Sequence, residues 1–427
     1  MNFEYFFAQR IVWKQQRAIS RLVVKLAIIS ITIAVITIVV SLSVVQGFES
    51  AIQEKVIGFA SHIHLGHYLS NFDEEEKPLY RSDPDILSLD SLPLIKSIEP
   101  YVSYAGLSRS ESASLGVECK GLTATYDWSF FEESLVAGEL PDYSGEKQSL
   151  DILISATQSR MLDVEVGERI RIYFPRDSVI KPRRVTIGGI FDSGMEEFDQ
   201  LFMICDLKML QKVRNWEPEE ISGFEVRMEQ TQEECGLVWD GSRFPFIHYF
   251  CDDPIVSTTR RINELTPYAY GATSIKALYP EIFDWLGLQH QNVWVIMLLM
   301  AVVAIINMTS VVLILILERT QTIGVLMAMG MAANRIQRVF VVNAFLLIGT
   351  GVLIGNLIAF GLLAAQYKFN FLSLSQDSYF INTVPVAWVW GRFLLANIGI
   401  ILVCTLFMVI PSWMITRISP VKAIRFD

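Results

Sequence analysis

The sequence predicts a membrane protein with four helical spans and an α+β domain exported between the first and second span. The 427 residues are 52% hydrophobic and have a mean hydropathy of +0.38. These values are typical of the membrane class. The apolar residues gather in four long uncharged runs, and residues 48–287, between the first two runs, are rich in charged and turn-forming residues. The prediction is therefore a membrane α-helical fold that carries an α+β extracytoplasmic domain.

Each uncharged run is long enough to cross a bilayer. The runs are 26–46, 293–317, 339–365 and 393–415. All exceed the roughly 20 residues that an α-helix needs to cross about 30 Å of hydrocarbon. With their flanks they predict spans at 22–47, 290–317, 338–366 and 392–415. The first run is too long for the core of a signal peptide and no A-x-A site follows it, so it is interpreted as a retained span.

Basic residues predict the orientation. Residues 1–25 hold five Lys and Arg against Glu4 alone, and basic residues recur in 318–338 and in 416–427. The positive-inside rule puts these segments in the cytoplasm, so both termini and a short helix at 318–337 are expected there. Residues 1–21, with Phe3, Phe6 and Phe7 among basic residues, predict an amphipathic helix on the membrane surface.

The exported segment, 48–289, is predicted as a domain on two helical stalks. Residues 48–287 carry 22 Lys and Arg against 41 Asp and Glu, a net charge of −19. Apolar residues at helical spacing continue the first span past the membrane, and 274–294 returns to helical character. Between the stalks, 150–156, 169–174 and 184–191 are β-branched and bounded by turn residues, which predicts strands. Residues 367–391 form the second, short external loop.

We expect this chain to have no catalytic, metal-binding or nucleotide-binding site of its own. The sequence has no Walker A motif, no G-x-S-x-G and no H-E-x-x-H, and the acidic exported domain excludes nucleic acid as a partner. His62 and His64 can share a strand face, but structural roles outweigh a metal site. The acidic stretch 196–200 is expected to be a solvated loop rather than a catalytic pair. No catalytic or metal-ligating residue is predicted, and the chain itself is expected to bind no cofactor.

The spans contain almost no ionisable residues, which argues against an ion pathway. Asn307, Asn343, Asn356 and Asn397 are expected to form hydrogen bonds between helices, and the G-x-x-x-G at 351–355 suits close helix packing. Of the four exported cysteines, Cys119, Cys205, Cys235 and Cys251, free thiols and one disulfide are equally compatible with the spacing.

Four stretches together are typical of one protein family: "VVQGFESAIQEKVI" (44–57), "LISATQSRMLDVEVGERIRIYFP" (153–175), "ERTQTIGVLMAMG" (318–330) and "SPVKAIRFD" (419–427). They resemble the FtsX/MacB-type ABC permeases, and within them the lipoprotein-releasing permeases of the LolC/LolE type. The first stretch is similar to the end of the family's first span and its stalk, and the second to a stretch of its MacB-like periplasmic core domain. The third resembles the family's coupling segment, and the fourth its terminus.

The resemblance implies a permease subunit that acts with a dimer of a separate cytosolic ABC ATPase, which binds Mg-ATP, and with a second permease subunit, the same chain or a homologue. Such a pair extracts lipoproteins from the outer leaflet of the bacterial inner membrane and passes them to a periplasmic chaperone. The implied ATPase-coupling residues are Glu318, Arg319, Ile323, Leu326, Met327, Met329 and Gly330.

Two further sites follow from the resemblance. A lipoprotein cavity is expected near the outer ends of spans one and two, lined by Val40, Val44, Gly47, Phe48, Trp294, Met297 and Ile305; plain bundle packing is the alternative for each. The family's chaperone-recruiting hairpin corresponds to 175–184, which is short here, so Arg176, Lys181, Arg183 and Arg184 are weak docking candidates. The alternative functions are a MacB-type mechanotransmitting exporter subunit and an FtsX-like transmembrane signalling protein.

Overall fold

A computed structural model describes residues 18–67, 77–92, 94–176, 179–229, 234–238, 248–374 and 381–412. It divides into two compact units. The helical unit comprises 1–51, 284–374 and 383–427, and the sheet unit comprises 52–283 and 375–382. The predicted surface helix at 1–21, except its last four residues, and the tail at 416–427 lie outside the described residues.

In the part of the chain that the structure describes, four long helices are apolar enough to cross a membrane. They are α2 (Ala18–Ala60), α10 (Pro280–Glu318), α12 (Ala333–Phe369) and α14 (Trp390–Ser412). The predicted first span and first stalk form one uninterrupted helix, because α2 contains no proline and continues through Gly47 and Gly58 to residue 60. The second stalk begins later than the predicted 274, since β14 (Tyr270–Ser274) and the short α9 (Ile275–Leu278) precede α10.

Small and amide residues hold the helices of the helical unit together. Gly351 and Gly355 of α12 lie against Ile31 and Val35 of α2. Asn307 bonds to Ser30, and Asn356 bonds to Asn397 of α14. These contacts confirm the predicted roles of the G-x-x-x-G motif and of three asparagines, because a missing Cβ lets backbones approach and an amide in an apolar bundle needs a partner. The fourth asparagine, Asn343, is buried, and its Oδ1 has no hydrogen-bond partner among the described residues.

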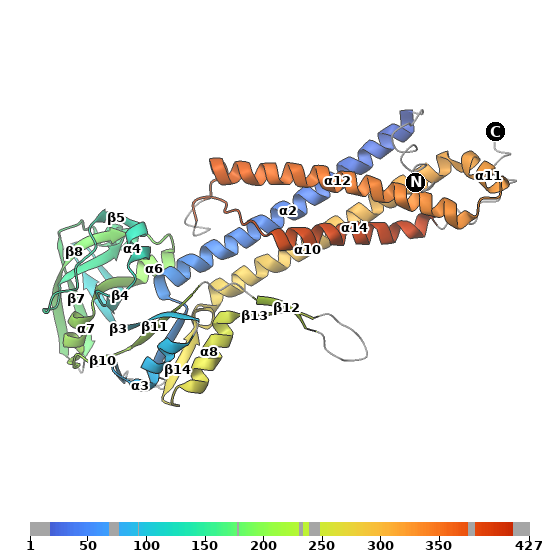
Figure 1. Ribbon diagram of the computed structural model, residues 1–427. Helices are drawn as coiled ribbons and strands as arrows, with labels where there is room; N and C mark the ends of the chain where they lie inside the picture. The colour runs from blue at the N-terminus through green and yellow to red at the C-terminus, as the bar shows by residue number, and fades with distance from the viewer. Residues whose placement is uncertain are drawn as a thin grey trace. The chain divides into compact units, whose positions relative to one another are not determined.

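The sheet unit is built on a mixed, ten-stranded sheet (Figure 1). Its order is β14-β1-β11-β3-β4-β9-β6-β8-β5, with β7 paired to β3 and β8. These strands are β1 (Ile63–His67), β3 (Ile95–Arg109), β4 (Ser114–Leu122), β5 (Leu135–Gly138), β6 (Asp151–Ser155), β7 (Arg169–Arg176), β8 (Val179–Phe191), β9 (Phe202–Asp206), β11 (Gly223–Met228) and β14 (Tyr270–Ser274). Two small ribbons pair β2 (Leu79–Tyr80) with β10 (Glu220–Ile221) and β12 (Glu234–Val238) with β13 (His248–Asp252).

Short helices cover this sheet, as an α+β domain requires. They are α3 (Pro84–Leu87), η2 (Ser88–Ser91), α4 (Ser129–Ser134), α5 (Ala156–Leu162), α6 (Glu196–Leu201), α7 (Leu207–Arg214) and α8 (Pro254–Leu265). In α5, Ser155 and Gln158 form a reciprocal capping box, and Asp163 ends the helix in the left-handed conformation. The predicted strands at 150–156, 169–174 and 184–191 are confirmed as β6, β7 and β8.

The acidic stretch 196–200 forms α6 rather than the predicted loop, because Phe198 and Asp199 turn inward and are buried. Cys119 and Cys205 are free, buried thiols. Cys235 and Cys251 stand opposite each other in the β12–β13 register, and their side chains lie outside the described residues. Within the described part of the chain, no cluster of His, Cys, Asp or Glu has the composition of a metal site.

Candidate functional site: the helix between spans two and three

The segment 318–330 forms a short, separate helix at one end of the helical unit (Figure 1). Glu318 is the last residue of α10, and Arg319 breaks the helix with φ −100° and ψ 11°. Helix α11 (Thr320–Ala328) follows, and Thr320 Oγ1 donates to the carbonyls of Ile316 and Leu317. The break redirects the chain, so α11 is an element of its own between two spans.

Gly330 ends α11 through a Schellman motif. Its φ is +90°, its N–H donates to Met327 O at 3.0 Å, and the N–H of Met331 donates to Leu326 O at 3.0 Å. This left-handed position favours glycine because a Cβ there would clash with the backbone. The end of the predicted coupling segment therefore differs from the expected 337: residues 333–337 already belong to α12.

Helix α11 has an inward and an outward face. Ile323 is 2% exposed and packs into the helical core, and Leu326 and Met327 are half-buried against the same core. Met329 is 78% exposed and Val325 is 49% exposed. Ile323 was predicted to lie on a partner surface, whereas here its side chain fills the bundle; Val325, which was not predicted, is on the free face.

The predicted cavity residues differ in burial and in their contacts. Val40, Met297 and Ile305 are half-buried and pack against one hydrophobic cluster to which α2, α10, α11, α12 and α14 all contribute. Phe48 makes an edge-to-face contact with Trp285 of α10, with ring centroids 5.5 Å apart. Val44 is half-buried, and Trp294 is 63% exposed.

Gly47 does not line an open space. A Cβ at this position would meet the Pro385 carbonyl oxygen at 2.8 Å. Beside it, Ser43 Oγ donates to Ala387 O at 2.8 Å, and Ala387 N–H donates to Ser43 O at 3.2 Å. The glycine is needed because the chain leading into α14 lies directly on α2, so its predicted role in a cavity is corrected to one in packing.

The segment 175–184 is part of a β-hairpin rather than a loop. Strands β7 and β8 pair from Arg169–Thr186 to Arg176–Val179, so only two residues separate them. Arg184 is exposed and Arg183 is half-buried. The side chains of Arg176 and Lys181 lie outside the described residues.

Three exposed arginines stand in one row across this hairpin and its neighbour. Arg109 of β3 pairs with Arg171 of β7, which pairs with Arg184 of β8. Like charges directly opposite disfavour a sheet, and none of the three has an ion pair with another described residue. Arg109 and Arg171 escaped prediction; the alternation in "RIRIYF" signalled the exposure of Arg171, but only strand pairing brings Arg109 beside it.

Two family models match most of the chain. The model for the "MacB-like periplasmic core domain" matches residues 26–233, and the model for the "FtsX-like permease C-terminal" region matches residues 294–420. The chain belongs to the FtsX/MacB-type permeases. For this permease, the four helices and the α+β unit therefore correspond to a multi-pass membrane part and a periplasmic domain.

Curated relatives of this permease cover nearly all of it at low identity. A "Lipoprotein-releasing system transmembrane protein LolC" from Neisseria meningitidis is 23% identical, covering 97% of this chain and 96% of the relative. A "LolE" protein of the same system from Haemophilus influenzae is 20% identical, covering 99% of both. The solved periplasmic region of MacB from Actinobacillus actinomycetemcomitans is 11% identical over 52% of this chain and 92% of its own, with a TM-score of 0.33.

Proposed function

We propose that this permease is a subunit of an ABC transporter that releases lipoproteins from the outer leaflet of the bacterial inner membrane. The observation that supports the proposal most is the full-length similarity to proteins named LolC and LolE, which spans the membrane part and the periplasmic domain together. The chain works as a non-catalytic transport subunit. Mg-ATP is bound and hydrolysed by a separate cytosolic ATPase dimer, and a second permease chain, identical or homologous, completes the transporter.

In this proposal both termini and α11 face the cytoplasm, as the distribution of basic residues predicts. Val325 and Met329 then form an apolar face on a short helix, the kind of surface that fits a groove on an ATPase. Glu318 and Arg319 mark the exit of α10, and Gly330 fixes where the helix stops. Movement of the ATPases is passed through α11 to α10 and α12.

The lipoprotein acyl chains are proposed to lie against Val40, Val44, Phe48, Trp294, Met297 and Ile305. Each buried CH₂ contributes about 0.8 kcal/mol, so an apolar lining suits acyl chains. The released lipoprotein is handed to a periplasmic chaperone. Arg184, with Arg109 and Arg171 beside it in the same row, is proposed as its docking surface, because a row of arginines with no ion pair among the described residues attracts an acidic partner. Arg183 is its neighbour on β8 and faces the other side of the sheet.

Depletion of the chain in its native bacterium tests the transport function. Lipoproteins destined for the outer membrane should accumulate in the inner membrane, measured by membrane fractionation. Normal lipoprotein sorting in depleted cells would refute the proposal. Failure of daughter-cell separation without a sorting defect would favour an FtsX-like signalling protein, and loss of small-molecule or toxin export alone would favour a MacB-type exporter.

The role of α11 is tested by Val325→Asp and Met329→Asp. Both side chains are exposed, so the bundle tolerates the change, but a charge on the apolar face should lower ATPase co-purification and lipoprotein release at least several-fold. Asn334→Asp adds the same charge at an exposed position on α12 and is the matched control. Full release by both α11 variants would exclude this face as the ATPase contact.

The docking surface is tested by the double variant Arg171→Glu and Arg184→Glu. Chaperone binding to the purified transporter should weaken at least tenfold and lose most of its salt dependence. Arg160→Glu changes an arginine of α5 outside the row and should bind as the native chain does. Unchanged affinity in the double variant would move the docking site elsewhere.

A further inference from the structure

The last turn of α2 ends inside the sheet unit, and all four of its terminal carbonyls are satisfied. Such carbonyls have no partner within a helix. Here each accepts one hydrogen bond: Ile57 O from the N–H of Ser61 at 2.7 Å, Gly58 O from Arg227 Nη2 at 3.2 Å, Phe59 O from Lys120 Nζ at 2.9 Å, and Ala60 O from His64 Nε2. Ser61 follows in the left-handed conformation with φ 59°.

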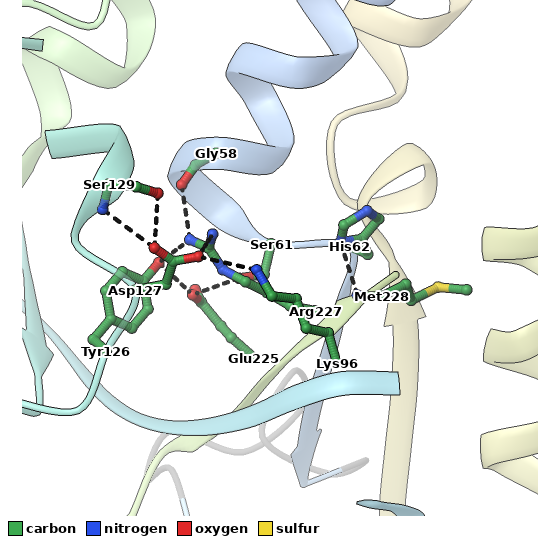
Figure 2. A network of polar contacts seen from close by, with 10 residues as sticks. All are labelled: Gly58, Ser61, His62, Lys96, Tyr126, Asp127, Ser129, Glu225, Arg227 and Met228. Atoms are coloured by element: carbon green, nitrogen blue, oxygen red, sulfur yellow. Dashed lines mark hydrogen bonds and ion pairs between the residues drawn. The ribbon is translucent and has the colours of Figure 1, made fainter. Parts of the chain in front are cut away.

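The three side-chain donors come from three different strands of one sheet. His64 belongs to β1, Lys120 to β4 and Arg227 to β11. Two of them are cations placed at the negative end of the helix dipole, where positive charge stabilises a helix. Figure 2 shows Arg227 beneath the end of α2, with its guanidinium group directed at Gly58. The helix end is therefore tied to the sheet at several points.

Each cation has a carboxylate of its own. Lys120 Nζ lies 2.6 Å from Glu225 Oε1, and both side chains are at most 5% exposed. Glu225 also accepts from Ser61 Oγ and Tyr126 Oη, each at 3.1 Å. Burial alone lowers the pKa of Lys120, but interactions with Glu225 and nearby tyrosines outweigh it, so its pKa is raised and the pair is ionised.

Arg227 forms its ion pair with a different carboxylate from the one that pairs with Lys120. Its Nη1 lies 2.8 Å from Asp127 Oδ2, and Asp127 in turn accepts from the backbone and hydroxyl of Ser129 (Figure 2). Lys96 is a more distant partner of Asp127, at 3.7 Å, and its side chain is 60% exposed. Lys96 makes no hydrogen bond to α2 among the described contacts.

Apolar packing holds the same turn from the other side. Phe59 is 1% exposed. Five phenylalanine rings surround it at centroid distances of 5.0–6.5 Å: Phe130, Phe131, Phe191, Phe198 and Phe202. These rings come from α4, β8, α6 and β9, so four separate elements pack around the end of α2.

We propose that this helix-end clamp (Phe59, His64, Lys120, Glu225 and Arg227) is where movement of the first span enters the periplasmic domain. Helix α2 is continuous over 43 residues, or about 65 Å at 1.5 Å per residue. Terminal turns of helices normally open easily, and a turn that opens absorbs a displacement. A turn with every carbonyl bonded to the sheet passes the displacement on. Lys120 and Arg227 are thus positioning residues for transport, an inference that rests on the proposed function.

The test compares Lys120→Met/Glu225→Gln and Arg227→Met with Lys96→Met in the full transporter with its ATPase. The double variant removes both charges of the buried pair, so no unpaired carboxylate destabilises the fold, while Phe59 O loses its donor. Lys96→Met changes a lysine of the same network that does not touch α2. Arg227→Lys retains a cation and should restore part of any loss.

Hydrogen exchange and transport are measured on the same samples. In the two clamp variants, exchange at residues 57–62 should rise by about tenfold, with strands β3 and β4 unchanged. ATP hydrolysis should persist while lipoprotein released per ATP falls several-fold. Lys96→Met should match the native protein in every measurement.

The possible failures are distinguishable. If the native transporter hydrolyses ATP but releases no lipoprotein, the proposed function fails. The clamp is then tested by hydrogen exchange alone. ATP should change the exchange of the sheet unit in the native protein, and this change should disappear in the clamp variants. The proposal for the clamp would be overturned if hydrogen exchange at residues 57–62 in the variants were as slow as in the native protein. It would also be overturned if exchange there were faster while lipoprotein release per ATP and the ATP-dependent exchange changes of the sheet unit stayed normal. Rapid exchange throughout the domain would mean that these residues only stabilise the fold.

Discussion

Gly355 of α12 lies directly on Val35 of α2: a Cβ added at position 355 would stand 2.8 Å from the Val35 Cβ. It would also lie 3.0 Å from the Thr32 carbonyl oxygen, which belongs to the backbone of α2 and cannot turn away. The two helices therefore approach as closely as they do because residue 355 has no side chain.

Gly355→Ala should destabilise the helical unit by about 1–3 kcal/mol through overpacking. Gly361→Ala on the same helix is the control, because nothing lies within 4 Å of an added Cβ there. Both changes improve helix propensity equally, so the difference between them reports the contact alone. Unfolding in mixed detergent micelles measures it, and equal stability of the two variants would show that α12 does not press on α2.

Asn356→Ala should cost about 1 kcal/mol of bundle stability. Asn356 and Asn397 donate to each other at 2.9 and 3.1 Å, and each also donates to a carbonyl of its own helix at 2.8 Å. Removing one amide leaves the other without its partner in an apolar setting. The double variant Asn356→Ala/Asn397→Ala should lose less stability than the sum of the losses of the two single variants. Unfolding measurements that give a strictly additive loss would argue against a hydrogen-bonded pair.

Asp199→Asn should flatten the pH dependence of periplasmic-domain stability between about pH 4 and 6. Burial, only partly offset by bonds from Ser193, raises the pKa of Asp199 from 3.8 to about 6. The native state therefore binds a proton that the unfolded state has released, so this contribution to stability is present below pH 3.8 and is lost as the pH rises through 6. The Ser193 N–H bond to Oδ1 survives in the Asn variant. Thermal unfolding of the full chain at a series of pH values measures the effect; an unchanged profile would contradict it.

His62→Asn should also flatten the pH dependence of stability, here by removing a loss on acidification over the range from pH 6.5 down to 4. Burial, with the positive charge of Arg227, lowers the pKa of His62 to about 4. Its stabilising contribution is complete above pH 6.5 and is lost as the pH falls through 4, since the unfolded chain binds the proton first. Asn retains an acceptor for the Met228 N–H, which bonds to His62 Nδ1 at 3.2 Å. The variant should lose less stability on acidification than the native chain, and a steeper acid loss would refute the assignment.

The sequence alone determined the four spans and the strands at 150–156, 169–174 and 184–191. These features depend on neighbours along the chain: the length of an apolar run and alternation over a few residues. The predicted helix contacts of the glycines and of three of the four asparagines also held, because polar or missing side chains in an apolar bundle have few alternatives.

Tertiary structure decided which side chains are exposed and which are packed against other elements. Ile323 shares the apolar pattern of α11 with Met329, yet only packing against the bundle buries the first and leaves the second exposed. Gly47 is a packing position only because the segment that precedes α14 lies directly on it. The clamp joins Phe59, Lys120 and Glu225, and the arginine row joins positions 109, 171 and 184, across gaps that run from about a dozen to about a hundred residues. Strand order and register set those distances, and neither is written in the local pattern of any one strand.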